Sequence, residues 1–141
     1  MNNHLFKLVY VALLTFVCAT NSWAEVSVIV HPSISDSASK KDISRIFLGK
    51  SKALPGGHKV TPISLSEGNS ARDEFNEIVL RKSDSQLKSY WSKLIFTGKG
   101  QPPSELESDA DAVAKVASDP NSIGYVDSAS VTDAVKVLST F

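Results

Sequence analysis

The sequence predicts an α/β domain in which helices flank a mixed β-sheet. Short β-branched runs alternate with amphipathic segments, so that strands and helices follow in the order β-α-β-α-α-α-β-β. The 117 residues from 25 to 141 are enough for one compact domain with a core, but not for two lobes of ordinary size. The sequence contains no internal repeats and no low-complexity segments. We therefore expect a single domain over residues 25–141.

The first part of this domain is predicted to hold two strands and one helix. Residues 26–30 contain three valines and one isoleucine, which is typical of a buried strand. After a polar loop, a short helix is predicted from residue 39 or 40 to Gly49. Residues 59–64 form the second predicted strand, and Pro62 predicts that this strand lies at an edge of the sheet or contains a bulge.

Two amphipathic segments come next and are predicted to be helices, each burying one apolar stripe. The first begins at Ser70, and the second covers residues 84–96. The stripes consist of Phe75, Ile78 and Val79 in the first helix and of Leu87, Trp91, Leu94 and Ile95 in the second.

The last part of the chain is predicted to add one helix and two strands. Pro102 and Pro103 keep the loop after the second amphipathic helix extended. Residues 109–118 read as a helix, and residues 122–126 and 135–138 read as strands. Between the two strands we expect a brief turn or helix near residues 130–134.

Residues 1–24 have the pattern of a cleaved secretory signal peptide. Lys7 precedes an apolar run over residues 8–17, which is too short for a comfortable membrane span, and small residues stand at Ser22 and Ala24. Cleavage after Ala24 would remove Cys18, the only cysteine, so the exported domain would have no disulfides. It would also remove the apolar run, so we expect no stable membrane insertion of the mature domain. Lipid attachment is disfavoured because large residues precede Cys18.

Charge is distributed unevenly along the predicted domain. Its 14 basic and 15 acidic side chains give a net charge of −1, which argues against nucleic acid as the main partner. Residues 38–99 carry 12 basic and 6 acidic side chains, whereas residues 100–141 carry 2 and 7. The electropositive part therefore suits an anionic ligand.

A polar turn between the second strand and the helix at Ser70 is the main candidate binding feature. It offers the side chains of Ser66, Asn69 and Ser70, with Arg72 in the first helical turn. Free backbone N–H groups at a helix start attract phosphate, sulfate or carboxylate. The same letters also have a structural interpretation, in which Ser70 caps the helix and Asp73 supplies an acidic N3 residue. The turn alone leaves both interpretations open.

Other kinds of chemistry find little support in the sequence. His31 and His58 have no metal-ligand partner at the usual spacings, so we expect no metal and no cofactor. Serines are abundant, but no Gly-x-Ser-x-Gly motif is present. Since no nucleophile, base and oxyanion donors can be assembled, we expect that the protein is not an enzyme.

Several short segments, taken together and in order, resemble a known family. These are residues 43–50, 60–63, 64–75, 90–91, 96–98, 102–103 and 123–126. They resemble the phosphate-binding-protein-like domain of the substrate-binding proteins of phosphate ABC importers. The resemblance extends over most of residues 26–127 and implies a single lobe of a type II periplasmic-binding-protein-like fold, similar to the second lobe of that family.

The resemblance also implies a ligand and the residues that bind it. Phosphate or a similar oxyanion would lie at the helix start, where the family usually has Arg, three residues, and then Ser-Gly-Thr. Here Leu65 stands at the arginine position and Asn69-Ser70-Ala71 at the tripeptide. The predicted ligand-binding residues are Ser66, Asn69, Ser70, Ala71 and Arg72.

The function that follows is that of an exported, periplasmic oxyanion-binding protein related to ABC-importer substrate-binding proteins. One helix terminus with a neighbouring arginine contributes roughly 1–2 kcal/mol, so a single lobe should bind phosphate only weakly, on the order of millimolar. Importer membrane subunits or a second protein chain would be its protein partners. The alternative is a periplasmic interaction or assembly module that has lost ligand binding.

Overall fold

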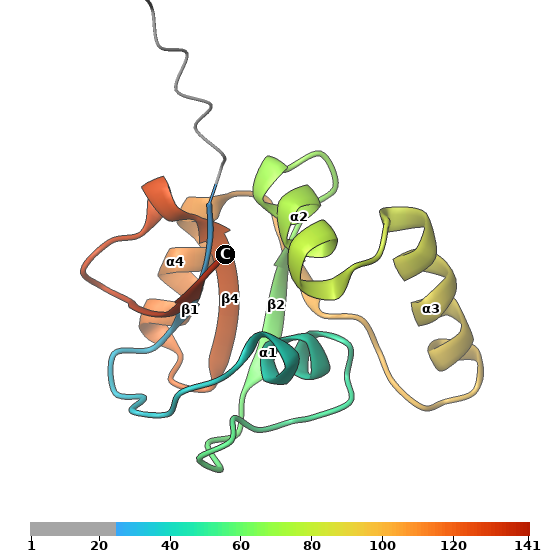
Figure 1. Cartoon of the computed structure of the whole chain (residues 1–141), viewed down its shortest axis with the longest axis horizontal. Coiled ribbons are helices and arrows are strands. Elements are labelled where there is room, and N and C mark those ends of the chain that lie inside the picture. The colour runs from blue at the N-terminus through green and yellow to red at the C-terminus, as the bar shows by residue number, and fades with distance from the viewer. Residues whose placement is uncertain (1–24) are drawn as a thin grey trace, which may run out of the picture.

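The computed structural model describes residues 25–141, so the predicted signal peptide lies outside the described residues. The chain folds around a five-stranded sheet with the strand order β3-β2-β4-β1-β5 (Figure 1). The strands are β1 (Val26–Val30), β2 (Thr61–Leu65), β3 (Ser104–Leu106), β4 (Ser122–Asp127) and β5 (Lys136–Thr140). The helices are α1 (Lys40–Phe47), α2 (Ser70–Phe75), α3 (Asp84–Phe96) and α4 (Asp109–Ser118), together with a π-helical turn at Asn76–Leu80 and a 3₁₀ turn at Ser128–Ser130.

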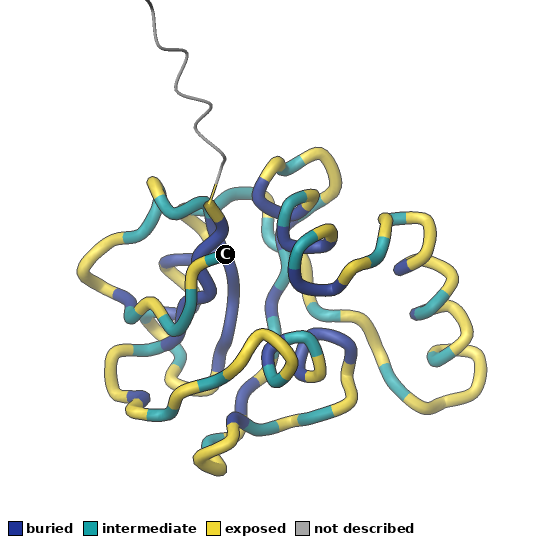
Figure 2. The backbone as a smooth tube through the Cα atoms, in the orientation of Figure 1, coloured by how far each residue is buried: buried dark blue, intermediate teal, exposed yellow. Residues whose placement is uncertain are grey.

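The sheet is mixed, as the sequence predicted. β1 runs antiparallel to both β4 and β5, whereas β2 runs parallel to both β3 and β4. Residues 122–126 of β4 are all buried, and so is the whole of β1 (Figure 2). The core therefore centres on these two strands.

Helices cover both faces of the sheet. Tyr125 of β4 stacks on Phe75 of α2 with ring centroids 4.0 Å apart, and its ring lies 5.7 Å from that of Phe47 of α1. Its neighbour Gly124 faces Val116 of α4. Because successive residues of a strand point to opposite faces, α1 and α2 lie on one face and α4 lies on the other.

The position of the second strand in the sheet differs from the prediction. β2 lies between β3 and β4, not at an edge of the sheet. Pro62 pairs with Ile123 of β4, but the pairing with β3 begins only at Ile63. The proline thus lies where β2 has one strand neighbour, which spares the sheet a missing hydrogen bond. β3 itself was predicted only as an extended loop.

Local signals fixed most helix boundaries. Ser39 and Asp42 form a reciprocal capping box at the start of α1, and the bounds of α3 and α4 agree with the predicted ranges. α2 continues directly into the π-helical turn, which ends at Arg81 in a left-handed conformation with φ 55°. β5 begins and ends later than predicted, and the turn before it lies at Ser128–Ser130.

The third helix stands away from the body of the molecule (Figure 1). Leu87 and Trp91 are buried as predicted, but Ile95 is 53% exposed and Phe96 is 92% exposed. The prediction that Ile95 belongs to the buried stripe is therefore wrong, whereas Leu94 is half-buried against the core. None of the helices within residues 25–141 is long and apolar enough to cross a membrane.

Candidate oxyanion site at the start of α2

The predicted site lies at the C-terminal end of β2, where the chain turns into α2. Gly68 adopts φ 88°, a conformation that favours glycine and brings the chain round to Asn69. The hydroxyl and the N–H of Ser66 both donate to the carbonyl oxygen of Leu106, over 3.2 and 2.9 Å. The turn is thereby fastened to the end of β3, and the Ser66 hydroxyl is engaged within the protein.

Asn69 caps α2. Its Oδ1 accepts a hydrogen bond from the N–H of Ala71 over 2.9 Å, and its Nδ2 donates to Oδ1 of Asp109 over 2.9 Å. The other oxygen of Asp109 accepts from the N–H of Asp127. The structural interpretation that Ser70 is the cap is therefore wrong by one residue: Ser70 is the first helical residue and is exposed.

Two backbone donors at the start of α2 remain open. Among the described residues, the N–H groups of Ser70 and Arg72 have no hydrogen-bond acceptor, whereas that of Ala71 is bound by Asn69. Ala71 itself is buried. Open N–H groups at a helix start are the feature from which the sequence predicts an anion site, and two of them are present here.

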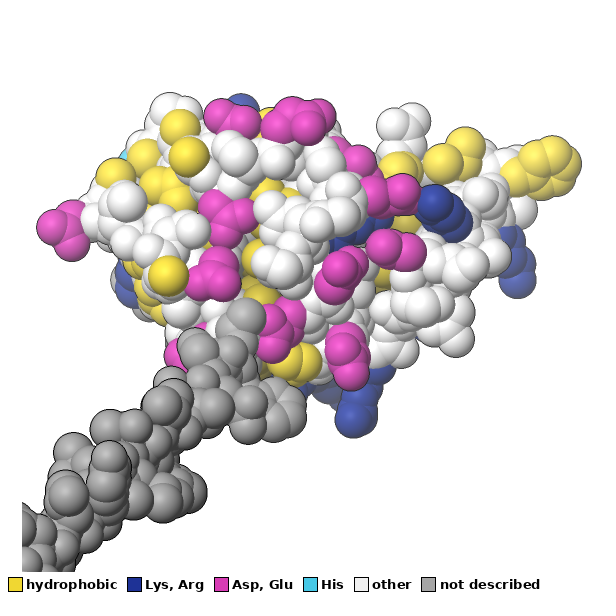
Figure 3. Space-filling view, turned by 90° about the horizontal axis from the view of Figure 1, so that it is seen from above, with side chains coloured by type: hydrophobic (Ala, Val, Ile, Leu, Met, Phe, Trp, Pro, Cys, Tyr) yellow, Lys and Arg dark blue, Asp and Glu magenta, His cyan; other side chains and the backbone are white. Residues whose placement is uncertain are grey.

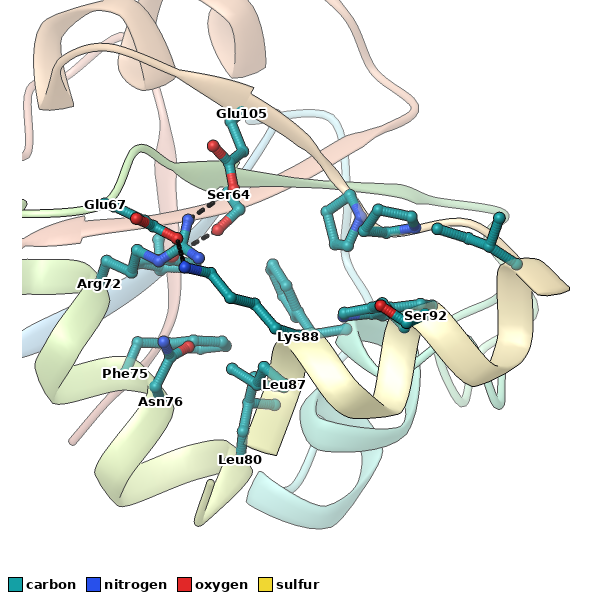
Figure 4. Close-up of a pocket in the computed structure, with 16 residues that line it drawn as sticks. Ser64, Glu67, Arg72, Phe75, Asn76, Leu80, Leu87, Lys88, Ser92 and Glu105 are labelled. Atoms are coloured by element: carbon teal, nitrogen blue, oxygen red, sulfur yellow. Dashed lines mark hydrogen bonds and ion pairs between the residues drawn. The ribbon is translucent and has the colours of Figure 1, made fainter. Parts of the chain in front are cut away.

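Arg72 turns back toward the end of β2, where three oxygens accept hydrogen bonds from its guanidinium. Figure 4 shows Arg72 beside one of these partners, Glu105. Nη1 donates to the carbonyl oxygen of Leu65 and to Oε1 of Glu105, each over 2.7 Å, and Nε donates to Oδ1 of Asp84 over 3.2 Å. Burial alone would lower the pKa of Arg72, but the hydrogen bonds and charges of Glu105 and Asp84 outweigh it and raise the pKa above its usual value. The Arg72 side chain is 9% exposed, and the two carboxylates already neutralise the positive charge of its guanidinium.

A pocket of about 260 Å³ opens beside this arginine (Figure 4). Its walls are largely apolar and come from α2, α3 and the segment before β3, with Phe75, Leu87 and Trp91 among the lining residues. Lys88 and Glu67, which also line it, form an ion pair of 2.7 Å. The charged groups around the pocket therefore pair with one another.

The face above the turn is acidic. Figure 3 looks down on the end toward which β2 points in Figure 1, and acidic side chains there outnumber basic ones. Around the turn the acidic side chains include Glu67, Asp73, Glu105 and Asp109. An anion docked at Ser70 would meet this negative field as well as the helix dipole.

Three acidic partners of the site were missed by reasoning from the sequence. Asp84, Glu105 and Asp109 come from α3, β3 and α4, which are far from the turn in sequence. Only the packing of the sheet brings them to Arg72 and Asn69, so no local signal could have identified them. Within residues 25–141, no three His, Cys, Asp or Glu side chains form a group that could hold a metal ion.

Tyr125 is a further residue that the sequence left ambiguous. It is buried, and its hydroxyl lies 2.7 Å from Oγ of Ser64 and accepts from the N–H of Leu65 over 3.2 Å. Burial raises the pKa of this phenol. Tyr125 therefore fixes the end of β2 from which the turn and Arg72 depart.

Comparison with known proteins places this arrangement in a known fold. No protein-family model matches the chain, and no curated protein matches its sequence. Solved structures do match. An ABC-type phosphate transport receptor from Vibrio cholerae superposes with a TM-score of 0.64 at 12% identity, over 82% of this chain and 46% of the receptor.

Two further structures agree with this match. A putative phosphate ABC transporter substrate-binding protein from Clostridium perfringens, solved with bound phosphate, gives a TM-score of 0.62 at 21% identity, over 82% of this chain and 45% of that protein. PstS from Borrelia burgdorferi gives 0.60 at 15% identity, over 82% and 47%. This chain spans about half the length of these proteins. It therefore has the fold of one lobe of the substrate-binding proteins of phosphate ABC transporters.

Proposed function

We propose that this chain is an exported, periplasmic oxyanion-binding lobe that binds phosphate weakly at the start of α2. The observation that carries the proposal is the pair of open N–H groups of Ser70 and Arg72 at the end of β2. The similar protein from Clostridium perfringens was solved with bound phosphate, which supports the choice of ligand. The ligand-binding residues of the proposal are Ser66, Asn69, Ser70, Ala71 and Arg72.

Weak binding is expected because most side chains of the site already form hydrogen bonds or ion pairs within the protein. Arg72 is neutralised by two carboxylates, and the side chains of Ser66 and Asn69 are bound to Leu106 and Asp109. A phosphate would then gain mainly from two backbone donors and the helix dipole, which together contribute roughly 3–5 kcal/mol. We therefore expect a dissociation constant in the millimolar range, about 10 mM at the weakest.

Isothermal titration with phosphate and with sulfate tests the proposal. We expect weak saturable heat and a rise in melting temperature near 10 mM ligand, which is about the weakest affinity that the estimate allows. A protein with neither heat nor a thermal shift at that concentration would contradict the proposal.

The substitution Ser70→Pro removes one open donor without disturbing the helix. Proline is well tolerated at the first helical position, and Asn69 already has the extended conformation, ψ 127°, that a following proline requires. Phosphate affinity should fall about tenfold, since one hydrogen bond to a charged group is lost. Lys40→Pro at the first position of α1 is the matched control and should leave phosphate binding unchanged.

The second candidate function is an interaction or assembly module without a ligand. The neutralised guanidinium of Arg72 favours it, because the cation nearest to the site is committed to Glu105 and Asp84. This candidate expects no response to phosphate in any variant, including those that free Arg72 from its carboxylates.

A further inference from the structure

A second concave surface lies at the opposite end of β2 from the candidate oxyanion site. It is a groove of about 900 Å³, and Val60, Thr61 and Pro62 at the start of β2 line one side of it. Tyr90 and Trp91 of α3 line the other side. We call this surface the lysine groove, for the four lysines described next.

The rim of the lysine groove carries a single sign of charge. Lys50, Lys52, Lys59 and Lys99 line it and are exposed, and no Asp or Glu is among its lining residues. None of these four lysines forms an ion pair with another residue of the part that the structure describes. In contrast, Arg72 and Lys88 beside the oxyanion site are both neutralised by carboxylates. Four lysines without an ion-pair partner in the described part of the chain thus line one hollow.

The floor of the lysine groove is apolar and firmly held. Trp91 packs edge-on against Tyr90 with ring centroids 5.0 Å apart, and the Tyr90 hydroxyl donates to the carbonyl oxygen of Leu48 over 2.6 Å. Leu94 and Pro103 add aliphatic surface. Aromatic side chains fixed in a concave surface are typical of the centres of protein interfaces.

We propose that the lysine groove binds an extended segment of a partner protein that carries both acidic and apolar side chains. The four lysines complement the acidic groups, which steers and orients the segment, and the apolar floor covers its apolar side chains. A purely polar polyanion would leave this floor exposed to water. A flat lipid surface would not reach it, because the surface is concave.

This proposal is independent of the proposed oxyanion function. The two sites lie at the two ends of β2, and the only lining residues shared by the lysine groove and the pocket beside Arg72 are Trp91, Pro102 and Pro103. Loss of phosphate binding therefore leaves the groove proposal standing, and the reverse also holds.

The experiment uses the protein purified after processing by its host cell. Binding of labelled peptides to it is measured by fluorescence anisotropy. The probes are an alternating Glu/Leu peptide of about eight residues, its Lys/Leu counterpart and an all-Glu peptide of equal length. We expect the Glu/Leu peptide to bind at least about tenfold more tightly than either of the others, since only it uses both rim and floor. Its affinity should fall at high salt and stay unchanged in about 10 mM phosphate.

Charge reversal at the rim provides matched variants. Lys52→Glu and Lys59→Glu, tested separately, should each weaken the Glu/Leu peptide about threefold or more, because an attraction becomes a repulsion. Lys41→Glu makes the same change at an exposed position of α1 outside the groove and should have no effect.

Four results would overturn the proposal. The first is equal binding of the Glu/Leu and Lys/Leu peptides, and the second is equal loss of binding in all three variants. The third is stronger binding of single-stranded DNA or of anionic phospholipid vesicles than of the Glu/Leu peptide. The fourth is a salt-sensitive dimer that Lys52→Glu abolishes. The last result would mean that a second copy of this chain occupies the groove.

Discussion

Arg72 joins three parts of the fold through its guanidinium. It contacts the end of β2 through the Leu65 carbonyl, β3 through Glu105 and the start of α3 through Asp84. Its side chain is buried while those of Asp84 and Glu105 are 34% and 50% exposed. The same residue that the sequence offers as a phosphate ligand is therefore a structural cross-link.

Replacing Arg72 should destabilise the protein. Arg72→Ala removes the hydrogen bond to the buried Leu65 carbonyl and both ion pairs. We expect a loss of about 2–3 kcal/mol, less than for a fully buried pair because both carboxylates reach solvent. Urea unfolding followed by circular dichroism measures the loss. Arg45→Ala, at an exposed position of α1, is the control and should change stability by less than about 0.5 kcal/mol. Equal effects of the two substitutions would contradict the cross-linking role.

Glu105 accepts a hydrogen bond from the Arg72 guanidinium, so an oxyanion would have to compete with this carboxylate for Arg72. Glu105→Gln keeps the shape and a hydrogen-bond acceptor but removes one negative charge next to the guanidinium. If phosphate binds at this site, its affinity should rise about threefold to tenfold in the variant, as measured by isothermal titration. Glu107→Gln, two residues along the chain, is the control for the change of net charge. An affinity that rises equally in both variants would show a general charge effect instead.

At the scale of single elements, α3 contains both buried and exposed apolar residues, and the sequence does not distinguish between them. Its capped start and amphipathic pattern predict its bounds, but only Leu87 and Trp91 of this helix are buried. Ile95 and Phe96 belong to the outlying half of the helix (Figure 2). Periodicity gives the apolar face of a helix, and it does not give the length over which that face is covered.

Substitutions along α3 should show this difference in stability. Leu87→Ala removes a buried side chain and should cost about 2–3 kcal/mol, whereas Phe96→Ser should change the free energy of unfolding by less than about 0.5 kcal/mol. Urea unfolding of the two variants against the parent protein measures both values. A large cost for Phe96→Ser would mean that the end of α3 is covered in solution.

At the scale of the whole molecule, the uneven charge distribution becomes a spatial one. Acidic side chains gather at the end where β2 meets α2 (Figure 3), and the four lysines of the lysine groove lie at the other end of this strand. A net charge close to zero hides this polarity. The two ends therefore differ in the charge of the partners that they attract.

Export is the remaining prediction for the whole chain, and it concerns residues outside the described part. Expression in a diderm bacterium should yield a periplasmic protein that begins at Glu25, since the signal pattern ends in the small residue Ala24. Intact-mass spectrometry of the periplasmic fraction measures the cleavage point. A species that retains Cys18 with an attached lipid would show processing as a lipoprotein instead.

The sequence by itself determined the class of fold and most of its elements. Local rules suffice there, because the Ser39 cap, the valine-rich β1 and the periodicities of α3 and α4 act within a few residues of each element. The family resemblance gave the lobe, and the solved structures match it. The position of the oxyanion candidate also followed from the turn at Ser66–Asn69.

The tertiary structure decided the chemical state of that candidate. Ion pairs of Arg72 with Asp84 and Glu105, and the bond of Asn69 to Asp109, join residues 12 to 40 positions apart. Such contacts depend on the strand order β3-β2-β4, which brings β3 beside the end of β2. The same order places β2 inside the sheet despite Pro62. Local sequence patterns carry no information about contacts between residues so far apart in the sequence. The charges that surround each end of β2 could therefore be read only from the folded structure.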